Sequence, residues 1–132
     1  NQNKILKKLK KENPELLDHH RKVYRPWGWY DSIEIGEGFQ VKRLHVYPKE
    51  QLSVQKHMHR SERWVVIKGV ATVLVGNKKE KYKKGEVVII KKKQVHSLAN
   101  TTKSPVEIIE GQLGSYLGED DIIRYSDKYG RD

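Results

Sequence analysis

The chain contains no cysteine, one methionine and one phenylalanine among its 132 residues. The absence of cysteine excludes disulfide bonds, thiolate zinc sites and cysteine nucleophiles together. Any metal ion must therefore be held by His, Glu, Asp or Gln, which suits borderline or harder divalent cations. The same absence fits a reducing compartment, and we expect a cytoplasmic protein.

Long apolar runs are also missing. No segment of about 18 apolar residues exists, so we expect no membrane span. The basic segment Asn1–Lys11 lacks the continuous apolar stretch of a signal peptide. Helical patterning is confined to the N-terminal part. We therefore expect a helical extension or linker over residues 1–23 and one domain over residues 24–132.

Positive charge dominates the composition, with 27 Lys and Arg against 17 Asp and Glu and a formal net charge of +10. The lysines are spread along the chain in pairs and triplets. Lysine also outnumbers arginine, whereas base and phosphate recognition favours arginine. We therefore expect a solvated basic surface and no nucleic-acid partner. Attraction of a phosphorylated small molecule is a better specific use of this charge.

Short β-rich runs separated by turn signals follow Tyr24. They cover residues 38–47, 51–57, 63–68, 70–75, 85–90, 97–100 and 106–113. The segment VLVGNKKEKY predicts a hairpin with Gly76-Asn77 in its turn. In the polar C-terminal tail we expect a short helical turn at Asp120–Arg124. Many short strands without intervening helices predict an all-β antiparallel sandwich or small barrel.

The segment LSVQKHMHRSERWVVIKG, residues 52–69, carries the candidate chemistry. On a strand, Gln55, His57 and His59 point to one face, because side chains alternate. Inward imidazoles are costly in an apolar core unless something binds them, and a divalent metal does so. Glu62 can join the site from the next strand, which leaves metal positions open as in catalytic centres. The alternative is two surface histidines on the outer face of a strand.

A second segment, GEVVIIKKKQVHSLAN, places His96 just past a lysine turn. Together the two segments resemble the two motifs of the cupin superfamily. His57, His59, Glu62 and Gly69 match the first motif, and Gly85, His96 and Asn100 match the second. Lys91 and Lys93 replace the Pro and Gly of the second motif, which affects the turn and not the ligand. The resemblance implies a cupin fold, a double-stranded β-helix with a jelly-roll-like barrel.

The segments YRPWGWYDSI, FQVKRLHV and GSYLGEDDIIRYSDKYGR give a closer resemblance. They are similar to the C-terminal cupin domain of type II mannose-6-phosphate isomerases, which are fused to a mannose-1-phosphate guanylyltransferase. The similarity covers roughly Tyr24 to Arg131. It implies a metal-dependent interconversion of mannose 6-phosphate and fructose 6-phosphate.

The same resemblance implies roles for particular residues. Metal-site positions of the family fall on Gln55, His57, Glu62 and His96, with His59 as the usual cupin ligand beside them. Arginines on which the family's activity depends match Arg60 and Arg124. The metal can be zinc, manganese, cobalt, iron or nickel. Cupins often pair through open sheet edges, so a homodimer is expected.

Two departures from the family pattern bear on function. Met58 stands within the histidine run, and Arg63 occupies a position where the family usually has histidine. The glycine-rich nucleotide-binding segment of the guanylyltransferase half is absent, so this chain alone is not expected to make GDP-mannose. An alternative function is a non-catalytic module that binds a sugar phosphate or sugar nucleotide and supports a separate guanylyltransferase.

The general base of an isomerase is less clearly marked. Glu110 shares strand parity with Ile108 and Gln112, so its carboxylate can point into the barrel as a catalytic base. The alternative is a charge on the barrel rim. The aromatic cluster Trp27, Trp29 and Tyr30 is expected to pack the sheet edge onto the core, with sugar stacking as the alternative.

Overall fold

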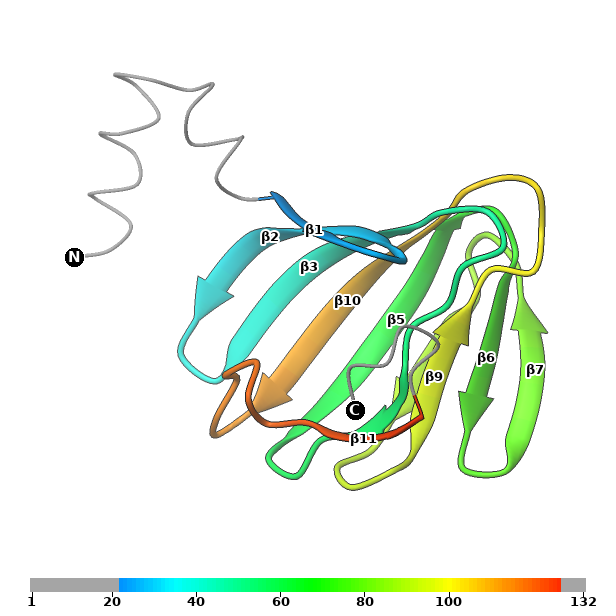
Figure 1. Cartoon of the computed structure of the whole chain (residues 1–132). Coiled ribbons are helices and arrows are strands. Elements are labelled where there is room, and N and C mark those ends of the chain that lie inside the picture. The colour runs from blue at the N-terminus through cyan, green and yellow to red at the C-terminus, as the bar shows by residue number, and fades with distance from the viewer. Residues whose placement is uncertain (1–21, 127–132) are drawn as a thin grey trace, which may run out of the picture.

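Two antiparallel β-sheets face one another in the computed structural model, which describes residues 22–126 (Figure 1). One sheet has six strands in the order β1-β2-β3-β10-β5-β8, and the other has five in the order β11-β4-β9-β6-β7. The strands are β1 (Lys22–Arg25), β2 (Gly28–Gly36), β3 (Phe39–Val46), β4 (Val54–Lys56), β5 (Arg60–Lys68), β6 (Ala71–Val75), β7 (Lys78–Tyr82), β8 (Val87–Ile90), β9 (His96–Ala99), β10 (Val106–Gly114) and β11 (Ile123–Ser126).

The described residues form no helix, which confirms the expected all-β class. Most of the N-terminal extension lies outside residues 22–126, and β1 begins at Lys22, two residues before the expected start of the domain. The helical turn expected at Asp120–Arg124 is wrong, because Ile123 and Arg124 belong to β11 and pair with β4. In the described part of the chain, no helix has the length and apolarity to cross a membrane.

Strands β1 and β2 form a hairpin that the sequence did not indicate. Its turn contains Trp27, which is 5% exposed and part of the core. The register between β2 and β3 shifts between Ser32 and Glu34, and this bulge breaks the alternation that would have marked β2 as a strand. The hairpin predicted around Gly76-Asn77 is present, with Val75 paired to Lys78.

The apolar core lies at one end of the space between the sheets. Val46 on β3, Val106 and Ile108 on β10 and Val66 on β5 are 0–1% exposed and face inward. Each such side chain contributes roughly 1.5–3 kcal/mol when fully buried. The complete set of buried apolar residues is Trp27, Leu44, Val46, Trp64, Val66, Ala71, Val73, Val88, Ile90, Leu98, Val106 and Ile108.

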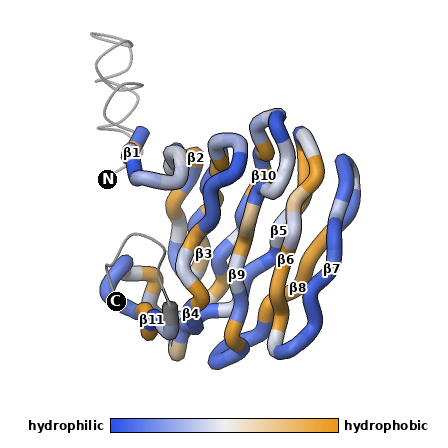
Figure 2. The backbone as a smooth tube through the Cα atoms, turned by 45° about the vertical axis from the view of Figure 1, so that its right-hand side comes forward, coloured by the Kyte–Doolittle hydropathy of each residue, from blue (hydrophilic) through white to orange (hydrophobic). Residues whose placement is uncertain are grey.

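The five-stranded sheet ends in a strongly charged edge strand. In β7, Lys78, Lys79 and Lys81 are exposed, whereas the neighbouring β6 buries Ala71 and Val73. Figure 2 shows β7 as hydrophilic beside the more hydrophobic β6. Lysines on an edge strand discourage pairing with another sheet.

Candidate functional site

A row of polar side chains lines the inner face of the six-stranded sheet, next to the apolar core. Along β10 the inward residues change from Val106 and Ile108 to Glu110 and Gln112. Across the ladder, Glu110 lies opposite Lys42 of β3, and Gln112 lies opposite Glu62 of β5. These four polar residues are only 1–6% exposed. They form one wall of a pocket between the two sheets.

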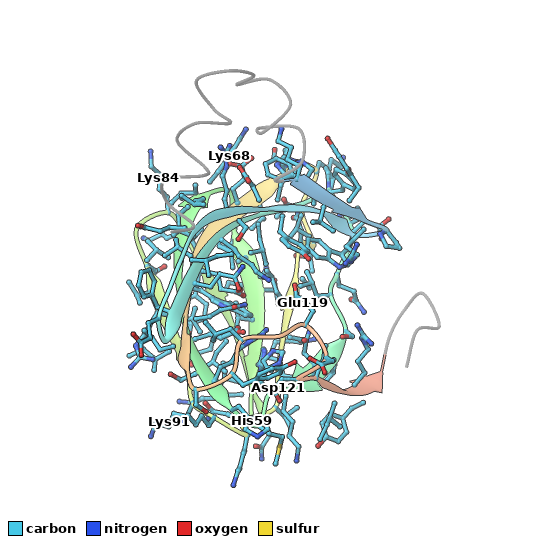
Figure 3. All side chains as sticks on the ribbon, turned by 90° about the vertical axis from the view of Figure 1, so that its left-hand side faces the viewer. His59, Lys68, Lys84, Lys91, Glu119 and Asp121 are labelled. Atoms are coloured by element: carbon cyan, nitrogen blue, oxygen red, sulfur yellow. The ribbon has the colours of Figure 1, made fainter. Side chains whose placement is uncertain are left out.

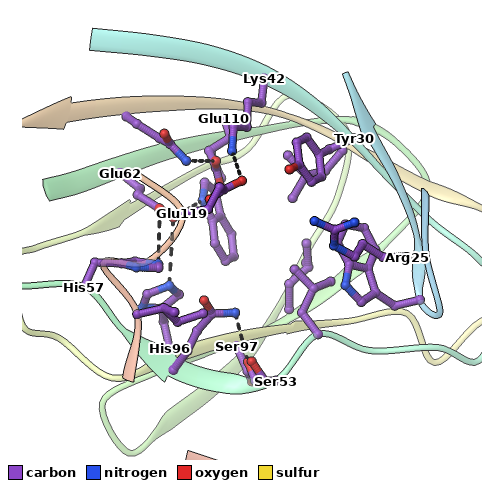
Figure 4. A pocket seen from close by; sticks show the side chains of 18 of the residues that line it. Arg25, Tyr30, Lys42, Ser53, His57, Glu62, His96, Ser97, Glu110 and Glu119 are labelled. Carbon is purple, nitrogen blue, oxygen red and sulfur yellow. Dashed lines mark hydrogen bonds and ion pairs between the residues drawn. The ribbon is translucent and has the colours of Figure 1, made fainter. Parts of the chain in front are cut away.

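Three possible metal ligands meet in this pocket. His57, Glu62 and His96 are buried, and their ligand atoms lie within 4.8 Å of one another. His57 Nε2 is 3.5 Å from Glu62 Oε2, and His96 Nε2 is 3.9 Å from Glu62 Oε1. Figure 4 shows both imidazoles directed at this carboxylate. Three of the residues that the two sequence motifs marked as possible ligands therefore lie close together in the structure.

The tautomers of both imidazoles follow from their backbone partners. His57 Nδ1 lies 2.6 Å from the Asp121 carbonyl oxygen, and His96 Nδ1 lies 2.9 Å from that of Gln94. Because a carbonyl only accepts hydrogen bonds, each Nδ1 carries the proton and each Nε2 carries the lone pair. Burial, followed by the Arg60 charge, lowers the pKa of His57 to about 4. Burial also lowers the pKa of His96, so both rings are neutral at pH 7.

The three side chains fit a divalent metal ion. Ligand atoms lie about 2.0–2.3 Å from such an ion, so two of them are about 3–4.5 Å apart, as His57 and Glu62 are. Two imidazoles and one carboxylate leave coordination positions open for further ligands. Trp64 Nε1 donates to Glu62 Oε1 at 3.0 Å, which orients the carboxylate toward the histidines. The described residues thus offer a metal site but do not select one metal.

The other two predicted ligands, Gln55 and His59, do not belong to the group formed by His57, Glu62 and His96. Gln55 lines the pocket, and its backbone lies opposite His96. Its amide nitrogen donates to the Ser53 carbonyl oxygen at 3.3 Å. Gln55 therefore lies beside the three possible ligands, with its amide nitrogen directed to the backbone.

His59 lies outside the cluster, with 58% of its side chain exposed and its Nδ1 3.3 Å from Asp121 Oδ1 (Figure 3). The expectation that it shares a face with Gln55 and His57 fails because β4 ends at Lys56. Beyond that residue the chain turns, and strand alternation no longer determines the direction of a side chain.

Arg60 begins β5 and points into the pocket, where it is 5% exposed. Its Nε donates to Glu62 Oε2 at 2.9 Å, and its Nη2 lies 3.2 Å from His57 Nε2. Its Nη1 is buried and has no hydrogen-bond partner within the described residues. A buried guanidinium with a free donor suits an anionic ligand.

Glu110 is buried inside the pocket, not on the barrel rim. Its Oε1 accepts a hydrogen bond from Gln112 Nε2 at 2.6 Å. Burial, and then the nearby carboxylate of Glu62, raise the pKa of Glu110 well above its usual range. A carboxyl group with a raised pKa beside a possible metal site is suited to proton transfer near neutral pH.

Three further cationic side chains line the pocket, and only one of them was expected from the sequence. Arg124 lines it as expected, and its buried Nε has no hydrogen-bond partner among residues 22–126. Arg25 and Lys42 also line it, although neither was predicted. Figure 4 shows Arg25 and Tyr30 across the pocket from His57. The pocket therefore holds the three possible metal ligands and several cationic side chains, of which Arg25 lies on the opposite side from His57.

The segment between β10 and β11, residues 115–122, closes one side of the pocket. Glu119 reaches Lys42, with 2.6 Å between Oε1 and Nζ, and its Oε2 lies 4.0 Å from Arg60 Nη1. Asp121 accepts hydrogen bonds from the backbone N–H groups of Met58 and His59 at 2.9 and 3.0 Å. This segment thus holds the turn at Met58 and His59, between His57 and Glu62.

Neither of the two residues that depart from the family pattern, Met58 and Arg63, lines the pocket. The Arg63 side chain is exposed on β5, and its Nη1 lies 3.4 Å from the Glu62 carbonyl oxygen. A histidine at position 63 would have the same outward direction, because residues 62 and 63 alternate on the strand.

Structural comparison confirms the cupin fold. A Klebsiella pneumoniae protein with a double-stranded β-helix domain superposes with a TM-score of 0.69 at 21% identity, covering 83% of this chain and 94% of that protein. KdgF from Halomonas sp. has a TM-score of 0.69 at 12% identity, covering 78% and 94%. Both likenesses concern the fold alone.

Sequence comparison is more specific. The mannose-1-phosphate guanylyltransferase of Salmonella montevideo is 48% identical over 128 residues, covering 97% of this chain and 27% of that protein. The alginate biosynthesis protein AlgA of Pseudomonas aeruginosa is 46% identical over 127 residues, covering 96% and 26%. The chain thus spans about a quarter of the length of these relatives. Residues 12–127 match the family described as mannose-6-phosphate isomerase C-terminal, and the chain belongs to that family.

Proposed function

We propose that this chain is a metal-dependent isomerase that interconverts mannose 6-phosphate and fructose 6-phosphate. The observation that supports it best is the placement of Glu110, a buried carboxyl group with a raised pKa, in the same pocket as His57, Glu62 and His96. A proton acceptor beside a divalent-cation site is the arrangement that aldose–ketose isomerisation requires.

The reaction moves one proton between C1 and C2 and a second proton between the oxygens on these two carbons, so that the carbonyl and hydroxyl groups exchange places. The Glu110 carboxylate takes the proton from one carbon and returns it to the other. Arg60, whose buried guanidinium lines the same pocket, donates to the sugar oxygen on which negative charge develops. A bound divalent cation supplies Lewis-acid polarisation of the sugar oxygens. The neutral imidazoles and Glu62 would hold that cation.

Arg25 and Arg124, which both line the pocket, are suited to the phosphate. Arg25 lies across the pocket from His57, and the buried Nε of Arg124 has no hydrogen-bond partner in the part of the chain that the structure describes. Two guanidinium groups can bind a phosphate through several charge-assisted hydrogen bonds. A sugar phosphate held there would extend its carbonyl end toward the metal ligands. The net positive charge of +10 would favour encounter with this anion.

A second function is favoured by the names of the relatives, which specify guanylyltransferase or alginate biosynthesis rather than isomerase. The chain would then be a binding module that supports a guanylyltransferase, and its pocket would hold a sugar phosphate or sugar nucleotide without turnover. The two functions differ in whether the pocket performs chemistry.

Production of fructose 6-phosphate from mannose 6-phosphate tests the isomerase directly. The chain would be stripped with a chelator and reloaded separately with zinc, manganese, cobalt, iron or nickel. Turnover that reappears with a metal supports the isomerase and identifies that metal. Saturable binding of the sugar phosphate with no turnover in any metal would favour the binding module and refute the isomerase.

Two variants of one strand sharpen this test. Glu110→Gln removes the proposed base and should lower kcat by about 10²–10⁴-fold while metal binding persists. Glu107→Gln removes a carboxylate from the opposite face of β10, where Glu107 bonds Arg43 and His45. It should leave kcat close to that of the wild type at 25 °C. Equal activity of both variants would contradict the role of Glu110.

A further inference from the structure

The Arg60 side chain forms hydrogen bonds with the same atoms of His57 and Glu62 that would coordinate a metal ion. Its Nε donates to Glu62 Oε2 at 2.9 Å, and its Nη2 lies 3.2 Å from His57 Nε2. Since the Asp121 carbonyl holds the His57 proton on Nδ1, Nε2 is an acceptor with a single lone pair. That lone pair can accept from Arg60 or coordinate a cation, but it cannot do both.

A second acceptor is available to the same guanidinium. Arg60 Nη1 is buried without a hydrogen-bond partner among the described residues, and it lies 4.0 Å from Glu119 Oε2. The Glu119 side chain is 55% exposed, so it has room to approach. Arg60 therefore lies between two carboxylates, hydrogen-bonded to Glu62 and within ion-pair distance of Glu119.

We propose that Arg60 and a divalent cation compete for His57 Nε2 and Glu62 Oε2, and that cation binding transfers the Arg60 guanidinium to Glu119. Arg60 thereby neutralises the buried Glu62 carboxylate when no cation does so. A buried carboxylate without a positive partner is costly, and this exchange keeps Glu62 paired in both states. The transfer also turns the Arg60 donors from the metal ligands toward the remainder of the pocket. This inference rests on the metal centre of the proposed function.

Co²⁺ titration of the full 132-residue chain, followed by its visible absorption, measures the competition without any turnover. Arg60→Gln should raise the Co²⁺ affinity by about 10–100-fold, because the cation no longer has to break two hydrogen bonds to charged or buried partners. Arg63→Gln removes the same charge from the outer face of the same strand and should change the affinity less than about threefold.

A double-mutant cycle separates competition from simple charge repulsion. Under competition, Glu119→Gln removes the alternative partner of Arg60, so it should weaken Co²⁺ binding by about threefold or more when Arg60 is present. It should have little effect in the Arg60→Gln background. Charge repulsion alone predicts the same weakening by Glu119→Gln in both backgrounds, and that result would overturn the proposal.

A structural readout follows the guanidinium itself. In ¹⁵N NMR spectra, saturation with diamagnetic Zn²⁺ should shift the Arg60 Nε–H resonance, and Glu119→Gln should alter its position in the Zn²⁺-bound form. An unchanged Arg60 resonance would overturn the transfer.

His57→Ala distinguishes this failure from failure of the metal centre. If His57→Ala leaves Co²⁺ affinity unchanged, the metal centre is wrong and the competition falls with it. If His57→Ala abolishes binding while Arg60→Gln matches the wild type, only the competition is wrong.

Discussion

Asp121→Asn tests how strongly the segment after β10 holds the turn at Met58 and His59. The Asp121 carboxylate is 4% exposed and accepts two backbone hydrogen bonds, from Met58 and His59. Hydrogen bonds to a charged group contribute about 1.5–3 kcal/mol each. Asparagine keeps one acceptor oxygen and the shape of the side chain. We therefore expect the free energy of unfolding at pH 7 to fall by about 2 kcal/mol.

The effect of Asp121→Asn should depend on pH in a defined direction. Burial alone would raise the pKa of Asp121, but the N–H groups of Met58 and His59 outweigh it and hold the pKa below its usual value. A carboxylate with a lowered pKa stabilises the fold above its ordinary pKa of about 3.9. That contribution disappears as the pH falls through the lowered value. The difference between the wild type and Asp121→Asn should therefore shrink below about pH 4.

Urea unfolding of chelator-treated protein between pH 7 and pH 3 measures both quantities. Asp120→Asn is a matched control, because Asp120 is exposed and bonds only the Tyr116 hydroxyl among the contacts found in the described residues. It should change the free energy of unfolding by less than about 0.5 kcal/mol. An Asp121→Asn protein as stable as Asp120→Asn, or a difference that does not change with pH, would refute the reasoning.

Three further substitutions test other parts of the structure. Glu107→Gln should cost about 1–2 kcal/mol at pH 7, because His45 and Arg43 bond this carboxylate and Arg43 is 44% exposed. Burial alone would raise the pKa of Glu107, but His45 and Arg43 outweigh it and lower the pKa. The loss of stability in Glu107→Gln, measured by urea unfolding, should therefore disappear as the pH falls through this lowered pKa. Lys93→Gly should raise the free energy of unfolding by about 0.5–1 kcal/mol, because Lys93 has a φ of 66°, a conformation that glycine adopts more easily than lysine. Lys92→Gly in the same turn is the control and should lower the thermal stability. Trp64→Phe removes the indole donor to Glu62 and should weaken Co²⁺ binding about 10-fold or more, and an unchanged affinity would exclude that orienting role.

The grouping of the three possible metal ligands could be predicted where strand geometry or motif spacing controls the direction of a side chain. His57, Glu62 and His96 meet as expected, although they come from three separate segments. His59 could not be placed by alternation, because β4 is only three residues long and ends before it. The turn that follows is held by Asp121, about 60 residues further along the chain, and no local pattern reveals that contact.

The cationic part of the pocket was harder to foresee. Lys42 shares strand parity with Leu44 and Val46, and that pattern alone could have marked it as a buried lysine. Its partner Glu119 lies 77 residues away, in a segment without regular structure. Arg25 belongs to a hairpin that the sequence did not predict, because the bulge in its second strand interrupts the alternation of side chains. These residues meet through tertiary contacts, which spacing along the sequence does not encode.

The polar row also constrains the register of the sheet. In the observed pairing, Glu110 lies opposite Lys42, and Ile108 lies opposite Leu44. A slip of β10 by two residues would keep the same side chains facing inward, so alternation alone does not exclude it. One direction of slip would place Glu110 opposite Leu44, where a buried carboxylate without a partner costs several kcal/mol. The residues proposed to carry the chemistry therefore also select the one register in which the core and the pocket both form.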